Sequence, residues 1–285
     1  MRIHPIKFLW RLGYLFTRVD DPTDECVTQS YNRLSPGYDE AWTHHMRDLS
    51  TQLIDELNPQ GGTALDLTCG TGFVTNLMAQ RIGGITTGVD RSEGMIRQAR
   101  ENYGDCCEFI QQDILVYLTS CPDQSLDLVT CAWGLGYSYP RAVLKQIKRV
   151  LKPGGHVAII DNSLFSLSEV MLCSFLSFLE KPQALKRLMR FRFLTGMTQL
   201  NLWLRWAGLH PVYLDKGTRT YTVANGQEAI ARMRATGAAA GFEYATDPDQ
   251  EEAVYTRFAE ILEQRYLKDG AIDINHRYMA GIAHA

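Results

Sequence analysis

The stretch that most constrains the fold is residues 64–72, with the sequence Ala-Leu-Asp-Leu-Thr-Cys-Gly-Thr-Gly. An apolar run of β type reaches a carboxylate and then gives way to two glycines, and a helical pattern follows from residue 73 to residue 80. This order predicts a strand, a tight turn and the start of a helix, the arrangement with which α/β sheets bind nucleotide-like cofactors. Gly70 and Gly72 have no Cβ, so the backbone can turn sharply there and approach a ligand closely.

A second carboxylate, Asp90, ends the next predicted strand, residues 85–90. A carboxylate in this place is suited to bind the two hydroxyls of a ribose. A dinucleotide site would need a third glycine at position 75, where the chain has Thr75. The spacing therefore weakens the interpretation as a nicotinamide-linked oxidoreductase, which a binding experiment with NADH would test.

Strand and helix patterns alternate over the middle of the chain. The expected elements are strands at 63–68, 85–90, 107–112, 126–131 and 155–161, and helices at 73–81, 92–102 and 140–151. Short connections between such units favour a parallel sheet covered by helices on both faces. We expect residues 1–58 to form an N-terminal helical segment, residues 59–162 the cofactor-binding core, and residues 163–285 a helical lobe with the strands that complete the same domain.

Residues 1–19 are basic and aromatic and contain no acidic side chain before position 20. At about 100° per residue, the polar side chains of a helix here fall on one narrow stripe. The stripe consists of His4, Lys7, Arg11, Tyr14 and Arg18. A helix of this kind is suited to a membrane interface, and it is also suited to packing on its own domain or on a second subunit. Membrane-surface contact through residues 1–19 and a homodimer are therefore both open at this point.

Composition excludes several classes of protein. The net charge of -3 gives no reason to expect a nucleic acid as a partner. The seven cysteines show no C-x-x-C spacing, which indicates reduced thiols in a cytoplasmic protein. No apolar run reaches the roughly 18 residues of a membrane-spanning helix, and no metal-ligand spacing repeats, so we expect no metal.

Five motifs follow one another along the middle of the chain. They lie at residues 65–72, 88–96, 112–114, 125–131 and 150–157. In this order the chain resembles the class I S-adenosylmethionine-dependent methyltransferases, and within them the small-molecule enzymes of the ubiquinone and menaquinone type. The resemblance implies an α/β fold with a Rossmann-like, mostly parallel seven-stranded sheet and helices on both faces. To this the chain would add a helical cap and the N-terminal amphipathic helix.

The resemblance also implies S-adenosyl-L-methionine as the cofactor and a set of residues that bind it. Asp90 is expected at the ribose hydroxyls, and Asp66 behind the turn, near the amino acid portion. The adenine side would be formed by Arg91, Met95, Asp113 and Ile114, and the methionine side by Thr68 and Cys131, next to Gly70 and Gly72. Tyr31 lies where relatives of this type have a tyrosine-containing stretch that helps to close the cofactor pocket. Thr68 departs from the family pattern, which usually has glycine there, so an altered pocket or an unusual use of the cofactor is a further interpretation.

The sequence gives fewer indications of which residues bind the methyl acceptor. An added base is needed only if the nucleophile must lose a proton, so no catalytic residue is assigned. The expected acceptor contacts are Tyr38, Trp133 and Tyr137, and the candidate bases are Tyr38, His44, His45, Tyr137 and His156. The basic and aromatic stretches favour a small lipophilic or aromatic acceptor, such as a quinone precursor or a lipid. Two alternatives stay open: an enzyme of this fold that catalyses a reaction other than methyl transfer, and a non-catalytic, membrane-associated binding protein.

Overall fold

The computed structural model describes residues 3–18, 21–84, 86–238 and 240–285. The chain forms two compact units that interleave along the sequence. Unit 1 comprises Met1–Ser30, Phe165–Phe191 and Thr218–His276, and unit 2 comprises Tyr31–Leu164, Arg192–Gly217 and Arg277–Ala285. These boundaries do not follow the three consecutive segments expected from the sequence, because each unit is assembled from separate stretches of chain.

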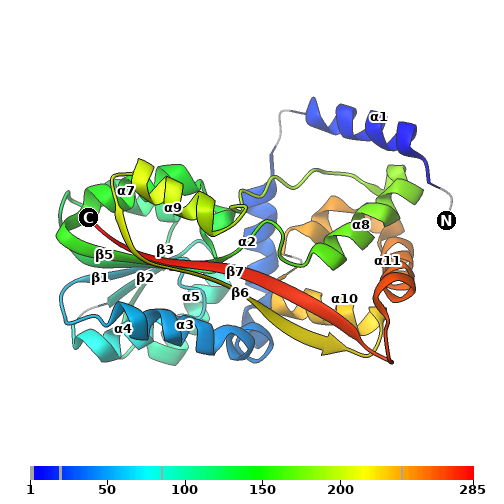
Figure 1. Ribbon diagram of the computed structural model, residues 1–285. Helices are drawn as coiled ribbons and strands as arrows, with labels where there is room; N and C mark the ends of the chain where they lie inside the picture. The colour runs from blue at the N-terminus through cyan, green and yellow to red at the C-terminus, as the bar shows by residue number, and fades with distance from the viewer. Residues whose placement is uncertain (1–2, 19–20, 85, 239) are drawn as a thin grey trace. The chain divides into compact units, whose positions relative to one another are not determined.

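A seven-stranded sheet forms the centre of unit 2, in the order β3-β2-β1-β4-β5-β7-β6 (Figure 1). The strands are β1 Ala64–Leu67, β2 Thr86–Asp90, β3 Glu108–Gln111, β4 Leu126–Ala132, β5 Leu151–Asn162, β6 His210–Val223 and β7 Ile272–His284. The first five pair in parallel, and β7 runs antiparallel to β5. The last residues of β6 and the first residues of β7 belong to unit 1. The predicted mostly parallel, Rossmann-like sheet is therefore confirmed.

Helices cover both faces of this sheet (Figure 1). One face carries α6 Ile114–Ser120, α7 Pro140–Val150 and α9 Met197–Trp206, and the other carries α3 His44–Leu57, α4 Phe73–Ile82 and α5 Glu93–Tyr103. The alternation of side chains along a strand explains the two faces. Leu65 and Leu67 of β1 share a buried cluster with Leu144 of α7, whereas Ala64 packs with Ile54 of α3 and with α4.

Several elements differ from the sequence expectation. Helix α6 was not expected, because it is short and its first residues were interpreted as a ligand motif. Strand β5 begins at Leu151 instead of residue 155. Its pairing with β4 contains a bulge: six residues of β5, from Leu151 to His156, lie opposite three of β4, from Leu126 to Leu128, and Gly154 in the bulge has a φ of 77°. Position 85, the expected start of β2, lies outside the described residues.

Unit 1 is mainly helical. Its helices are α1 Pro5–Phe16, the first part of α2 Thr23–Leu34, α8 Ser168–Glu180, α10 Gly226–Thr236 and α11 Glu251–Tyr266, with 3-10 turns at Pro182–Ala184, Phe242–Ala245 and Pro248–Gln250. The helices α8, α10 and α11 share a core with the unit 1 ends of β6 and β7. The predicted amphipathic N-terminal helix is present, although positions 1, 2 and 19 lie outside the described residues. Within the described chain, we find no helix with the length and apolar character needed to span a membrane.

Candidate functional site

The predicted turn lies at the carboxyl end of β1, between β2 and β4 in the sheet. Gly72 has a φ of 89°, and a Cβ at this residue would lie 2.8 Å from Cζ of Phe109. Gly70 has a φ of 53°, but a Cβ there would meet no atom within 4 Å. The two glycines therefore serve different purposes: Gly72 allows the turn to pack on β3, whereas Gly70 leaves an open side that a ligand can approach.

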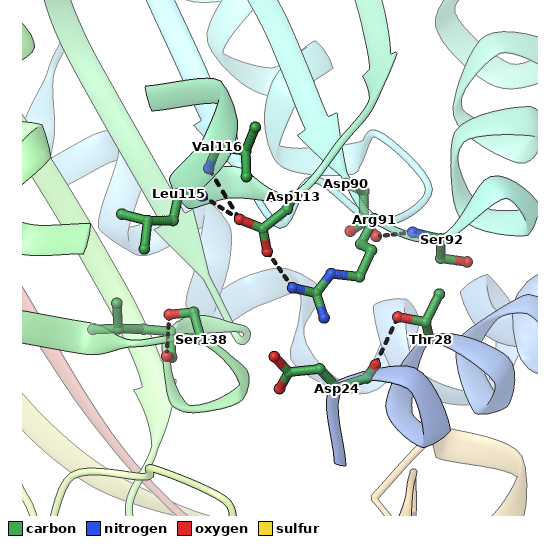
Figure 2. A network of polar contacts seen from close by, with 10 residues as sticks. Asp24, Thr28, Asp90, Arg91, Ser92, Asp113, Leu115, Val116 and Ser138 are labelled. Atoms are coloured by element: carbon green, nitrogen blue, oxygen red, sulfur yellow. Dashed lines mark hydrogen bonds and ion pairs between the residues drawn. The ribbon is translucent and has the colours of Figure 1, made fainter. Parts of the chain in front are cut away.

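Asp90 joins the end of β2 to this turn. Its Oδ2 accepts a hydrogen bond from the Gly70 N–H at 3.0 Å, and its Oδ1 accepts one from the Ser92 N–H at 2.9 Å (Figure 2). Burial raises the pKa of Asp90, although the two backbone N–H groups oppose that shift. The structure thus brings the two main sequence signals, the glycine turn and the second carboxylate, into direct contact. Met95, on the helix that follows, is buried.

Arg91 and Asp113 form an ion pair beside Asp90 (Figure 2). The other carboxylate oxygen of Asp113 caps the first turn of α6, because it accepts the N–H groups of Leu115 at 2.9 Å and Val116 at 3.0 Å. Burial would raise the pKa of Asp113, but the Val116 N–H and the Arg91 guanidinium together hold it below its usual value. Ile114 is the buried first residue of that helix. The roles of these residues on the adenine side stay predictions.

Asp66 is fully buried and braces three elements. Its carboxylate accepts hydrogen bonds from the hydroxyls of Thr75 on α4, at 2.7 Å, and Thr130 on β4, at 2.6 Å. Burial raises the pKa of Asp66 to about 6, and the two hydroxyls oppose that shift. The carboxylate therefore holds the sheet and α4 together, and its predicted part near the amino acid portion of a cofactor stays a prediction.

Thr68 adopts a backbone conformation that is rare for a β-branched residue. Its φ is 57°, and that of Trp133 on the neighbouring strand end is 64°. The Thr68 hydroxyl donates to the Leu67 carbonyl at 2.5 Å, and a Cβ on Gly134 would lie 2.5 Å from the Thr68 Cβ. The side chain thus fills the space between the ends of β1 and β4, where Cys131 is buried, and it requires glycine at position 134.

Three tyrosines from two segments of the chain meet in unit 2. The ring centroid of Tyr31 lies 5.9 Å from that of Tyr38 and 5.9 Å from that of Tyr137. Burial raises the pKa of Tyr31 and Tyr38 well above the usual value and that of Tyr137 to about 12. Phenols held neutral in this way are poor general bases, so the structure favours Tyr38 and Tyr137 as contact residues over the predicted alternative role as bases.

Trp133 directly follows β4 in the sequence. The Trp133 Nε1–H donates to the Ser50 hydroxyl on α3 at 2.9 Å, and its ring lies edge-on to Trp42. The indole is therefore held on the α3 side of the sheet, and an acceptor contact stays a prediction.

His156, a predicted candidate base, pairs with Leu128, four residues before the pair Ala132–Ile160. At about 3.3 Å per residue, it lies about 13 Å from the site end of the sheet, so this candidate base was wrong.

The sequence did not predict the contacts of two polar residues around the turn, Asn32 and Asp39. The Asn32 Oδ1 accepts from the Ser92 hydroxyl at 2.7 Å and from the Gly94 N–H at 3.0 Å. The Asp39 Oδ1 accepts from the Thr71 hydroxyl at 2.5 Å. The position of Asp39 next to Tyr38 was the only available signal, and nothing in the sequence singled out Asn32. In the described ranges, no cluster of three or more His, Cys, Asp or Glu side chains could hold a metal ion.

Comparison with known proteins agrees with this geometry. Residues 64–155 match the family described as a methyltransferase domain, and the fold and this match together confirm the resemblance to the class I S-adenosylmethionine-dependent methyltransferases. Demethylmenaquinone methyltransferase of Listeria welshimeri is 34% identical over 154 residues, which are 49% of this chain and 64% of that protein. The 2-phytyl-1,4-naphtoquinone methyltransferase of Thermosynechococcus vestitus is 33% identical over 146 residues, or 49% and 62%. The chain thus matches slightly less than two thirds of the length of these relatives.

Solved structures share the fold at low sequence identity. The [4+2]-cyclase SpnF superposes with a TM-score of 0.59 at 17% identity, over 94% of this chain and 98% of that one. The YcgJ protein from Bacillus subtilis gives 0.56 at 16% identity, over 83% and 98%. Because a protein described as a cyclase shares the architecture, the fold by itself does not decide the chemistry.

Proposed function

We propose that this protein transfers a methyl group from S-adenosyl-L-methionine to a small lipophilic or aromatic acceptor. The observation that carries the proposal is the bond from the Gly70 N–H to Asp90, which sets a carboxylate beside the open side of the glycine turn. A carboxylate at the end of the second strand is suited to a ribose, and a backbone without side chain lets the ligand come close. The methyltransferase-domain match over residues 64–155 supports the reaction type.

The residues around the turn fit an adenosyl group. Asp90 would bind the ribose, and Arg91, Met95, Asp113 and Ile114 would form the adenine side. S-adenosyl-L-methionine supplies a methyl group on a sulfonium, whose leaving group is a neutral thioether. The protein's own part is to orient the acceptor and exclude water. Thr68 and Cys131 would lie on the methionine side, and Tyr31 would help to close the pocket.

The nature of the acceptor is supported by two observations. The aromatic cluster of Tyr31, Tyr38 and Tyr137 offers ring faces and edges to a flat or lipophilic molecule. Two relatives that match half of the chain carry quinone-type substrates in their names. We therefore propose a quinone-like acceptor or a lipid, methylated in the cytoplasm, where the seven free cysteines would stay reduced.

The test is transfer of a labelled methyl group to reduced naphthoquinones, with and without a prenyl tail, by the full chain. The proposal expects the label in the naphthoquinone product and equimolar S-adenosylhomocysteine. If the acceptor changes without gaining label, the protein is an enzyme of the same fold with another reaction. If no acceptor reacts although the cofactor is bound, a binding role without catalysis replaces the proposal.

We further propose that α1 contacts the surface of an anionic membrane. Phe8 and Leu15 anchor the helix within unit 1. Its outward apolar side chains are strongly exposed: Ile6 71%, Leu9 65%, Trp10 77% and Phe16 68%. Lys7 is exposed beside them, whereas Arg11 is half-buried and its Nε–H donates to the Leu185 carbonyl at 2.7 Å. The described part of the helix has no acidic residue. Exposed tryptophan and aliphatic side chains flanked by basic ones are typical of helices that lie in a lipid interface.

Sedimentation with lipid vesicles tests this contact. The full chain should sediment with vesicles that contain phosphatidylglycerol and less with vesicles of phosphatidylcholine alone, because the basic residues need an anionic surface. W10E should abolish sedimentation. V212E is the matched control, since Val212 is also an exposed apolar residue, at 62%, on β6 in unit 2. Equal binding by W10E and V212E would contradict the assignment.

A further inference from the structure

A segment that precedes the sheet lies across the glycine turn within unit 2. It comprises residues 31–43, here called the strap: the end of α2, a 3-10 turn at Ser35–Gly37 and a π-helix at Asp39–Thr43. The strap carries Tyr31 and Tyr38, two members of the tyrosine cluster. Single π-helical turns are rare and are often found at functional sites.

One end of the strap is fastened to the middle of the turn. Thr71 lies between Gly70 and Gly72, its side chain is buried, and its hydroxyl donates to the Asp39 Oδ1 at 2.5 Å. The same oxygen accepts the Thr43 hydroxyl at 2.8 Å, which is a contact within the strap. The Asn102 amide, on α5, reaches the Asp39 Oδ2 at 3.3 Å. Asp39 thus connects the strap to the turn that is expected to bind the cofactor.

The other end is fastened beside Asp90 instead of on the turn. Asn32 accepts hydrogen bonds from Ser92 and Gly94 at the start of α5. A Cβ on Gly94 would lie 2.6 Å from the Ser35 hydroxyl oxygen, so the strap and α5 are in close contact here. Between these two fastenings the chain makes short 3-10 and π turns, whose hydrogen-bond geometry is poorer than that of an α-helix. Side-chain contacts therefore contribute much of the stabilisation of the strap.

We propose that Asp39 and Thr71 form a latch that holds the strap over the adenosyl ligand and sets how fast that ligand leaves. This inference rests on the proposed function, because it concerns the same site. Both are positioning residues: the hydrogen bond would hold Tyr38 and Tyr31 in place without either residue taking part in methyl transfer. A hydrogen bond to a charged carboxylate contributes more than a neutral one. Its loss should speed ligand release by about 10- to 100-fold.

The experiment measures the release of S-adenosylhomocysteine from the full chain by stopped-flow displacement. D39A and T71V should each release the ligand about 10- to 100-fold faster than the wild type. The double variant should be no faster than D39A, since T71V removes only a bond that D39A has already removed. T71S keeps the hydroxyl and should restore the wild-type rate. T51V is the matched control, because Thr51 bonds only within α3, at Arg47.

The outcomes separate this inference from the proposed function. Thermal unfolding without ligand should leave D39A and T71V close to the wild type, so that faster release is not a sign of misfolding. If the variants bind S-adenosylhomocysteine but release it at the wild-type rate, or if the two effects add, the latch is refuted and the proposed function stands. If even the wild type does not bind the ligand, the proposed function and the latch are both overturned.

Discussion

Asp161 offers a prediction that follows from burial and charge alone. This residue lies near the carboxyl end of β5 and is fully buried. Its Oδ2 accepts from the Gly136 N–H at 2.7 Å, and its Oδ1 accepts from the Asn162 N–H at 2.8 Å. Burial raises the pKa of Asp161 from 3.8 to about 7, against the effect of these two donors. The carboxylate thereby anchors the short turn that carries Tyr137.

The raised pKa fixes the sign of a pH effect on stability. The folded protein holds the Asp161 proton more tightly than the unfolded chain, so the free energy of unfolding falls as the pH rises from about 4 to about 7. Between about pH 5 and about pH 8, ionisation of this one group should remove about 2.5 kcal/mol of stability. In Asp161→Asn nothing titrates at this position. The cost of its poorer hydrogen bonding, about 1–3 kcal/mol, should be the same at every pH.

Urea unfolding of the wild type and Asp161→Asn, at about pH 5 and about pH 8, measures this difference. The wild type should lose about 2.5 kcal/mol relative to the variant on going to the higher pH. The contribution of Asp66, whose pKa is also raised, is common to both proteins and cancels. Parallel stability profiles would refute the reasoning, because they would mean that Asp161 has no raised pKa in the folded state.

Four further substitutions test separate parts of the site. Gly72→Ala should lower the free energy of unfolding in urea by about 2 kcal/mol or more, because the added Cβ meets Phe109 and the residue has a positive φ. Gly70→Ala should lower it by only about 1 kcal/mol but should weaken the binding of S-adenosylhomocysteine. Asp90→Ala should weaken S-adenosylhomocysteine binding by about 1–3 kcal/mol in calorimetry, and unchanged affinity would remove Asp90 from the site. Trp133→Phe should lower the free energy of unfolding by about 1 kcal/mol and leave the affinity for S-adenosylhomocysteine unchanged. A large loss of that affinity would instead mean that the Trp133 indole contacts the ligand.

The parts of the site that could be predicted are those that depend on the pattern of neighbouring residues in the sequence. The run from Ala64 to Gly72 has an apolar stretch, a carboxylate and two glycines in succession, which predicts a strand followed by a tight turn. Parallel pairing of β1 with β2 then places Asp90 next to Gly70, as observed. Such inferences succeed because the carboxyl ends of parallel strands meet at one edge of the sheet.

The parts that could not be predicted depend on contacts between distant segments. Asn32 meets Ser92 and Asp39 meets Thr71 through side chains that no local periodicity encodes. The two compact units interleave for the same reason, because the long strands β6 and β7 leave one unit and enter the other. Asp113 illustrates an ambiguity of another kind, since a carboxylate after a strand can bind a ligand, cap a helix or do both.

Calorimetric titration of the full chain with S-adenosylhomocysteine tests the central claim most directly. We expect saturable binding at one site per chain, because the proposed adenosyl site combines the open side of Gly70 with the carboxylate of Asp90. Absence of binding at millimolar ligand, in a sample that unfolds cooperatively, would contradict it.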